Sequence, residues 1–248
     1  MPVAHRPRPF SALRLSLVTC FGGAVLLLGC EASRASPWEP VGTGQPLRDA
    51  VAVAARESDG AAAVATPRGV WIFSPDRAPV RLTPRGEVRD LAFDDAGVLW
   101  AATDVGLLRR APGGRTFSRV PLGGGGARRV ARIATSGTRL AVASEAGIFL
   151  RPSATAARTP TGAPTWIQPS FVPHRPATAV LYSTPESRDE PPAVLWAAVE
   201  GGLYRIALDG GGSSLGAESV ALPRLGERAA IQDLARVPSG LAVLTRHS

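Results

Sequence analysis

The sequence has few of the residues that bind transition metals: two cysteines and three histidines among 248 residues. Cys20 lies in an N-terminal apolar stretch that we expect to be removed, and Cys30, His174 and His247 remain beyond it. Zinc and iron sites of the cysteine or histidine type need several such ligands. We therefore predict no metal site and no cofactor. With one cysteine left in the processed chain, we also predict no intramolecular disulfide.

Lysine and asparagine are absent, and all 28 basic residues are arginine. Together with the abundant alanine and glycine, this composition indicates a high-GC genome more than a function. Removing residues 1–29, which carry three arginines and no acid, leaves 25 arginines against 20 acidic residues, a net charge of about +5. These arginines are scattered instead of forming a basic stripe with interleaved aromatic residues, so we predict no nucleic-acid partner.

The N-terminus has the three parts of a secretory signal. Arg6, Arg8 and Arg14 precede an apolar run over residues 15–29, which ends in a small residue before Cys30. That run is shorter than the roughly 18 to 20 residues that a membrane-spanning helix needs, which favours cleavage over permanent insertion. No adjacent arginine pair precedes the run, so a twin-arginine signal is not expected. Residues 1–29 are therefore predicted to be a signal peptide.

The segment Leu27-Leu28-Gly29-Cys30 resembles the lipobox of bacterial lipoproteins, although Leu28 stands where alanine or serine is common. The resemblance implies a diacylglyceryl group on the thiol of Cys30 and cleavage just before it. Two or three acyl chains hold a protein stably on a membrane. The implied location is the bacterial cell envelope, on its periplasmic or surface face, with the membrane as a partner. The alternatives are a plain secretory signal or an uncleaved anchor, with Cys30 as an ordinary thiol.

Residues 30–48 are rich in serine, proline, glycine and charge and show no periodicity, so we interpret them as a flexible tether. The remaining domain, residues 49–248, contains a repeat. Each copy is a strand of small residues, a short turn, a glycine and a second apolar strand. The glycines fall at 69, 106, 147 and 202, with spacings of 37, 41 and 55, the last lengthened by an insertion. Repeats of about 40 residues are typical of β-propellers.

A further strand precedes most of these hairpins, and a fourth, outer strand follows several. The predicted first strands are residues 51–55, 88–93, 130–134 and 231–235, and the predicted outer strands are 80–82, 116–120 and 218–222. Four short antiparallel strands make one propeller blade. We therefore predict an all-β, β-propeller-like array of about five four-stranded blades. The last blade is incomplete, since it reaches only residues 241–248. One explanation of the incomplete blade is that residues 38–41 supply its outer strand. Another is that the chain is truncated.

Leu99-Trp100-Ala101-Ala102-Thr103 followed by Gly106-Leu107 resembles the bacterial propeller repeats of the Asp-box (sialidase-type) and two-component-regulator kinds. The Asp-box itself is eroded, because Arg110 and Pro112 stand where its serine and aspartate belong. Sialidases use an arginine triad, a tyrosine nucleophile with a partnering acid, and a further aspartate. Tyr182 and Tyr204 are the only tyrosines, and Tyr204 occupies a packing position of the repeat. No residue is therefore assigned a catalytic role.

The acidic pairs Asp94-Asp95 and Asp189-Glu190 are predicted to be turn residues, because neighbouring strand residues point to opposite faces. Trp166 lies in a proline-rich stretch that interrupts the repeat, and it is the candidate binding residue; packing against a blade edge is its alternative. We predict an exported, membrane-anchored, non-catalytic module that binds or scaffolds a protein or glycan through propeller loops. The alternatives are an envelope glycosidase of sialidase type and a truncated, inactive fragment of a longer propeller.

Overall fold

The computed structural model describes residues 49–75, 77–123, 129–151, 166–183, 193–200, 202–209, 213–222, 229–237 and 240–247. All of them belong to the compact unit Gly42–Ser248. The predicted signal peptide, Cys30, the predicted tether and the pair Asp189-Glu190 lie outside the described residues. No helix in the described part of the chain is long and apolar enough to cross a membrane.

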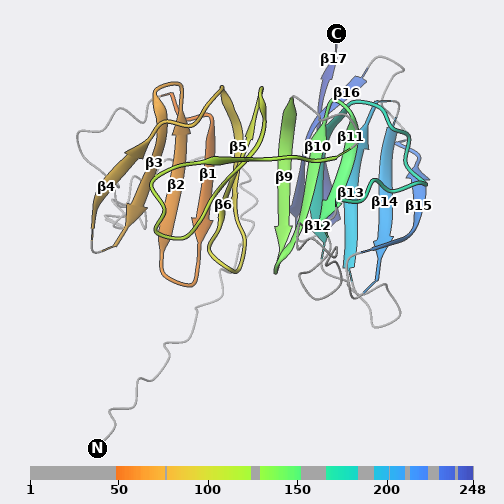
Figure 1. The fold of residues 1–248 in the computed structure, drawn as a ribbon. Helices are drawn as coiled ribbons and strands as arrows, with labels where there is room; N and C mark the ends of the chain where they lie inside the picture. The colour runs from red at the N-terminus through yellow and green to blue at the C-terminus, as the bar shows by residue number, and fades with distance from the viewer. Residues whose placement is uncertain are drawn as a thin grey trace, which may run out of the picture. The chain divides into compact units, whose positions relative to one another are not determined.

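The regular structure of the described residues is entirely β, arranged as five antiparallel sheets (Figure 1). The first sheet contains β1 (Ala52–Arg56), β2 (Ala61–Thr66), β3 (Gly69–Ser74) and β4 (Arg77–Leu82). The second contains β5 (Val88–Phe93), β6 (Leu99–Thr103), β7 (Gly106–Arg110) and β8 (Ser118–Val120). The third contains β9 (Val130–Ser136), β10 (Arg139–Ser144) and β11 (Gly147–Arg151). The fourth contains β12 (Ala177–Ser183), β13 (Ala193–Val199), β14 (Gly202–Leu208) and β15 (Ser214–Val220), and the fifth contains β16 (Ala229–Val237) and β17 (Gly240–His247).

Each sheet is one blade, and consecutive blades pack together through their first strands. β1 contacts β5, β5 contacts β9, β9 contacts β12, and β12 contacts β16. The second, third and fourth blades therefore each have one face toward the preceding blade and the other toward the next. This arrangement confirms the all-β, propeller-like fold that the repeat predicts.

Two features of the third and fourth blades differ from the expected pattern. Among the described residues the third blade has three strands, and its outer edge is covered by a single bridge in which Leu150 and Ile167 exchange two backbone hydrogen bonds of 2.8 Å. Prolines at 164 and 169 flank Ile167, and proline has no N–H to donate to a longer ladder. The first strand of the fourth blade, β12, was not predicted, because it follows this proline-rich stretch.

The core consists of apolar clusters between neighbouring blades. Central strands supply small side chains to it: Ala101, Ala141 and Ala197 have no solvent exposure, as the repeat predicts. Small residues let adjacent sheets approach closely, and larger residues of the flanking strands fill the remaining space. The interfaces between blades, and not the individual sheets, therefore make up the hydrophobic core.

The repeated glycines end a recurrent turn between the second and third strands. The hydroxyls of Thr66, Thr103 and Ser144 donate hydrogen bonds to the carbonyl oxygens of Gly69, Gly106 and Gly147, at 3.1, 2.6 and 2.9 Å. Gly69 has a φ of 134°, a conformation that residues with a side chain rarely adopt. A Cβ atom at this position would also lie 2.5 Å from the carbonyl oxygen of Leu82.

We expect Gly69→Ala to lower the free energy of unfolding by about 1–3 kcal/mol, because it combines an unfavourable φ with a backbone clash. The control is Gly216→Ala in β15, where an added Cβ has open space around it, and we expect little change. Urea denaturation of both variants measures the difference. Equal stability of the two variants would contradict this account of the turn.

Candidate functional site

Trp166, the candidate binding residue, lies beside Ile167 at the outer edge of the third blade. Its side chain is partly buried and packs against the apolar cluster between the second and third blades. The indole nitrogen is buried and has no hydrogen-bond partner among the described residues. The packed ring fits the interpretation that Trp166 packs against a blade edge. The indole nitrogen without a described partner fits the interpretation that Trp166 binds a ligand. Binding by Trp166 stays a prediction.

The first strands bring together one arginine and two aspartates. Arg132 Nη2 lies 3.4 Å from Asp233 Oδ2, which links the third blade to the fifth. Asp90 Oδ2 accepts a hydrogen bond of 2.8 Å from the amide of Ile133, which links the second blade to the third. Burial raises the pKa of Asp90, and this backbone hydrogen bond and Arg132 oppose the rise. These side chains tie blades together.

The tyrosines lie elsewhere. Tyr182 is partly buried near Arg139 and Arg151, and its burial raises the pKa of its hydroxyl well above the usual range. Tyr204 packs against the cluster between the third and fourth blades, at the packing position that the repeat assigns to it. Within the described ranges neither tyrosine belongs to the group formed by Asp90, Arg132 and Asp233. The described residues place Tyr182 near Arg151, which pairs with Asp94, so the sialidase-type alternative stays a prediction.

Asp94 and Asp95 lie in the turn between β5 and β6, as predicted. Asp95 is exposed, whereas the Asp94 side chain is 3% exposed. Asp94 accepts hydrogen bonds of 2.9 Å from the amide of Val98 and from the indole nitrogen of Trp100. Arg151, from the third strand of the next blade, lies 3.4 Å from Asp94 Oδ2 and 4.6 Å from the Trp100 ring centroid. Trp100 is thereby covered on the side of the next blade and has 1% exposure.

Trp196 occupies the equivalent position in the fourth blade. Trp100 pairs with Arg109 across the sheet, and Trp196 pairs with Arg205 in the same way. The two residues that cover Trp100, Asp94 and Arg151, have no equivalent among the described residues around Trp196. The same alignment of strands puts Ser183 where Asp94 stands, and the fifth blade, with β16 and β17 as its described strands, has no described third strand to carry a counterpart of Arg151. Trp196 accordingly remains partly exposed.

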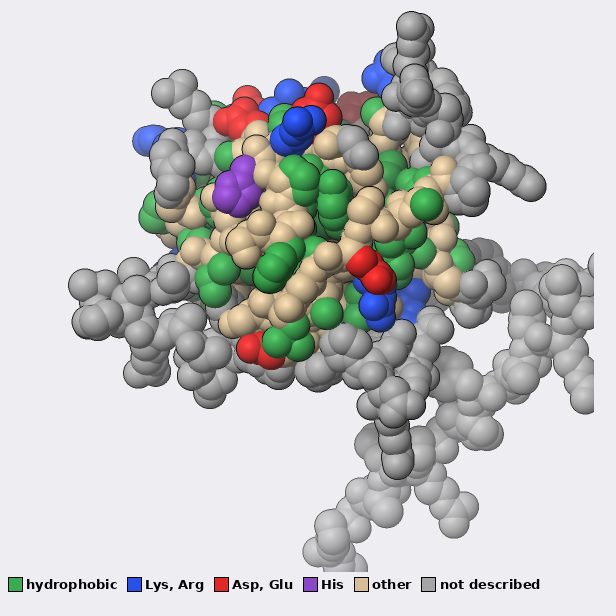
Figure 2. Space-filling view, turned by 90° about the vertical axis from the view of Figure 1, so that its right-hand side faces the viewer, with side chains coloured by type: hydrophobic (Ala, Val, Ile, Leu, Met, Phe, Trp, Pro, Cys, Tyr) green, Lys and Arg blue, Asp and Glu red, His purple; other side chains and the backbone are tan. Residues whose placement is uncertain are grey.

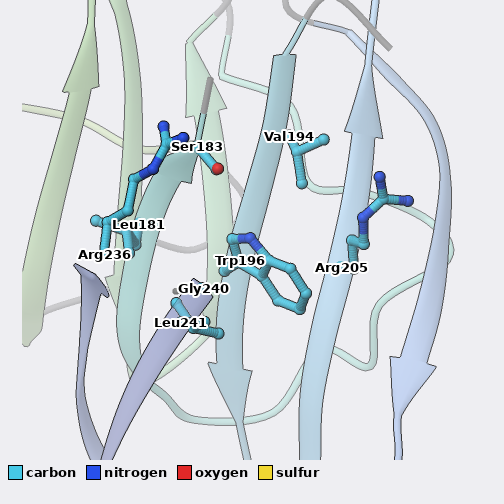
Figure 3. A pocket seen from close by; sticks show the side chains of 8 residues that line it. All are labelled: Leu181, Ser183, Val194, Trp196, Arg205, Arg236, Gly240 and Leu241. Atoms are coloured by element: carbon cyan, nitrogen blue, oxygen red, sulfur yellow. The ribbon is translucent and has the colours of Figure 1, made fainter. Parts of the chain in front are cut away.

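A groove of about 260 Å³ lies over Trp196, between the fourth and fifth blades (Figure 3). In Figure 3 the indole ring lies between Leu241 of β17 and Arg205 of β14. The described residues that line it are Leu181, Ser183, Val194, Trp196, Arg205, Arg236, Gly240 and Leu241. The floor is therefore apolar and aromatic, and two arginines stand at its margins.

The chemistry of this groove favours binding over catalysis. Among the described lining residues, Ser183 is the one hydroxyl side chain, and none carries a carboxylate or imidazole that could act as a general base. Arg205 Nη1 lies 3.4 Å from the carboxylate of Glu218, outside the lining. β17 pairs with β16 along one edge, and no described strand pairs with its other edge. An unpaired strand edge beside an apolar groove suits an added extended segment.

On the outer side of the fourth blade, Figure 2 shows no groove like the one over Trp196 among the described residues. Figure 2 shows this side, where apolar side chains are scattered among exposed backbone, with charges of both signs near the margins. The repeat position shared by Trp100 and Trp196 is visible in the sequence. The groove is not, because it depends on which residue of the following blade covers each tryptophan.

No family model matches this chain, and no curated protein matches its sequence. Solved structures do match its fold. Two are crystal structures of the extracellular domain of BT4673 from B. thetaiotaomicron, described as a one-component system and as a hybrid two-component system. Each is 14% identical to this chain, with TM-scores of 0.53 and 0.55 over 77% and 79% of it.

A third match is PorZ, a bacterial surface component of the type-IX secretion system of Porphyromonas gingivalis, with 13% identity and a TM-score of 0.54 over 80% of this chain. The chain spans 24%, 26% and 31% of the lengths of these three structures. At such identities the likeness shows the fold alone, which is that of a β-propeller-like array.

Because Trp100 is buried and Trp196 is partly exposed, their replacement should change the free energy of unfolding by different amounts. We expect Trp100→Ala to lower the free energy of unfolding by about 3–5 kcal/mol, because it leaves a cavity and removes a hydrogen bond from buried Asp94. Trp196→Ala, at the equivalent but partly exposed position, should cost less than about 2 kcal/mol. Chemical denaturation measures both, and Trp100→Phe replaces Trp100→Ala if the latter does not fold. Equal losses at the two positions would show that both rings are equally covered.

Proposed function

We propose that this protein is an exported, lipid-anchored binding module of the bacterial cell envelope, and that it holds an extended segment of a partner protein in the groove over Trp196. The observation that carries the proposal is the partly exposed tryptophan beside the edge of β17 that no described strand pairs with. At the equivalent place on the second blade, the third strand of the next blade covers Trp100. A strand from a partner would supply the same kind of cover to Trp196.

The location rests on the N-terminal sequence, in which a basic start, an apolar run and Cys30 resemble a lipoprotein signal. The matched structures support it, since two are extracellular domains and one is a bacterial surface component.

A protein segment fits the groove better than a glycan does. The free edge of β17 offers backbone N–H and C=O groups in the spacing of a β-strand, which an extended peptide satisfies. The apolar floor favours an apolar or aromatic side chain, and Arg205 and Arg236 favour a neighbouring carboxylate. An inactive fragment of a longer propeller would have no ligand for this groove, and a glycosidase would need catalytic acids, which the described lining residues do not supply.

The anchor predicts a specific mass and location. Extraction of the native protein from the membrane fraction should give the mass of residues 30–248 plus acyl chains. Cys30→Ser should move the protein from the membrane fraction to the soluble exported fraction, because no thiol remains to carry the lipid. Cys20→Ser is the matched control and should change neither the mass nor the location. An intact mass without acyl chains would overturn the anchor.

Selection of random twelve-residue peptides on the processed chain tests the groove. We expect the enriched peptides to alternate apolar residues with other residues and to carry at least one acidic side chain. Their affinity should fall by about tenfold or more in Trp196→Ala, the loss typical of an aromatic anchor at an interface. Arg205→Glu should weaken the acidic peptides further than peptides whose acid is replaced by glutamine.

The control for this selection is Leu215→Ala, an exposed apolar residue of β15 that does not line the groove. It should leave the affinities unchanged, as measured by isothermal titration calorimetry. Enriched peptides that bind Trp196→Ala as tightly as the original chain would place the binding site elsewhere. The absence of any enrichment would contradict peptide binding by this protein.

A further inference from the structure

A second groove, of about 580 Å³, lies between the outer parts of the first and second blades. Its margin carries three exposed arginines, Arg85, Arg115 and Arg119, while Leu82 and Leu108 form a buried floor. None of its described lining residues is acidic. The groove is therefore amphipathic, with cationic groups of one sign around an apolar base.

These three arginines differ from those that hold the blades together. Arg132 and Arg151 each pair with an aspartate of another blade. In the described part of the chain, the guanidinium groups of Arg85, Arg115 and Arg119 have no hydrogen-bond or ion-pair partner. Their donors are consequently directed to solvent and open to a ligand.

The local backbone brings the three cations together. Arg85 follows β4 in the loop to β5, and Arg115 and Arg119 flank the start of β8. The turn before Arg115 is held by two hydrogen bonds, from Arg110 Nε to the Gly114 oxygen at 2.6 Å and from the Gly114 amide to the Ala111 oxygen at 2.9 Å. Like charges gathered in one groove repel one another, and an anionic ligand removes that repulsion.

The groove lies next to the point where the chain enters the first blade. A smaller groove that contains Val51 also contains Thr83 and Pro84, and both of these line the arginine groove. Val51 comes almost directly after the predicted tether, residues 30–48. A flexible tether of this length has an end-to-end distance of about 25 Å. A lipid on Cys30 would therefore keep this end of the array close to the bilayer surface.

We propose that the arginine groove binds the phosphate headgroups of anionic phospholipids in the membrane that holds the anchor. The proposal rests on the lipid-anchored state proposed above. Guanidinium groups pair with phosphate oxygens in a bidentate manner, and a basic patch near a lipid anchor strengthens membrane association. Val105, which lines the same groove and is 39% exposed, adds an apolar contact at the interface. Docking here would orient the domain on the membrane.

The test uses the processed chain with Cys30→Ser, so that no lipid anchor contributes. The probes are vesicles of phosphatidylcholine alone and of phosphatidylcholine with about 30% phosphatidylglycerol, and co-sedimentation measures the binding. We expect binding to the anionic vesicles and little to the neutral ones. The combined variant Arg85→Gln, Arg115→Gln and Arg119→Gln should bind the anionic vesicles at least about tenfold more weakly.

The matched control removes the same net charge elsewhere. Arg129→Gln, Arg175→Gln and Arg246→Gln together replace three exposed arginines outside the groove, and this variant should keep most of the binding. Thermal unfolding should show that both variants remain folded. Equal losses in the two triple variants would mean that net charge alone attracts the vesicles, and the proposal would be overturned.

Two further outcomes also decide the matter. Absence of binding to anionic vesicles, combined with groove-dependent binding of a soluble poly-glutamate peptide, would assign the groove to an acidic protein segment and overturn the proposal. The intact mass of the native protein reports the anchor separately. A chain without lipid whose groove still binds phosphatidylglycerol would remove the anchor alone, whereas a lipidated chain whose groove binds no vesicle would remove the groove proposal alone.

Discussion

The whole structure depends on the burial of two apolar faces by each sheet. A single four-stranded sheet with apolar residues on both sides cannot cover either face by itself, and the second, third and fourth blades each pack between two others. The alanines of the central strands, such as Ala101 and Ala141, make this possible because they let neighbouring sheets approach closely. Ion pairs and hydrogen bonds between first strands, such as that from Ile133 to Asp90, then fix the position of one blade against the next.

The same constraint explains where binding surfaces arise. An apolar residue that the following blade covers is part of the core, and an equivalent residue without that cover becomes part of a site. Trp100 and Trp196 show the two cases in one chain, since Arg151 lies over the first while the second lines a groove. On the first blade, Val51, just before β1, and Val53 within it are 51% and 63% exposed. Sites in such an array are thus determined by coverage between blades more than by any local motif.

The repeat was predictable because its signals are local. A glycine at a turn, a hydroxyl three residues before it and alternating small apolar residues recur in the sequence, and the structure places strands there. β12 is not predicted from the sequence, because prolines before it and an insertion after it obscure the period. The pairing of Asp94 with Arg151 was not predictable, because it joins residues of different blades. The arginine groove has the same origin, since Arg85 and Arg119 meet only after two blades have packed together.

The exclusive use of arginine has structural consequences even where genome composition is its cause. Burial lowers the pKa of Arg151, but a guanidinium starts from so high a value that it remains charged over Trp100 and beside Asp94. A lysine at that place would lose its proton more readily and would not stack flat on an indole ring. Arginine therefore has two uses here. Arg132 and Arg151, each paired with an aspartate of another blade, hold blades together. Arg85, Arg115 and Arg119 line a groove and have no such partner among the described residues.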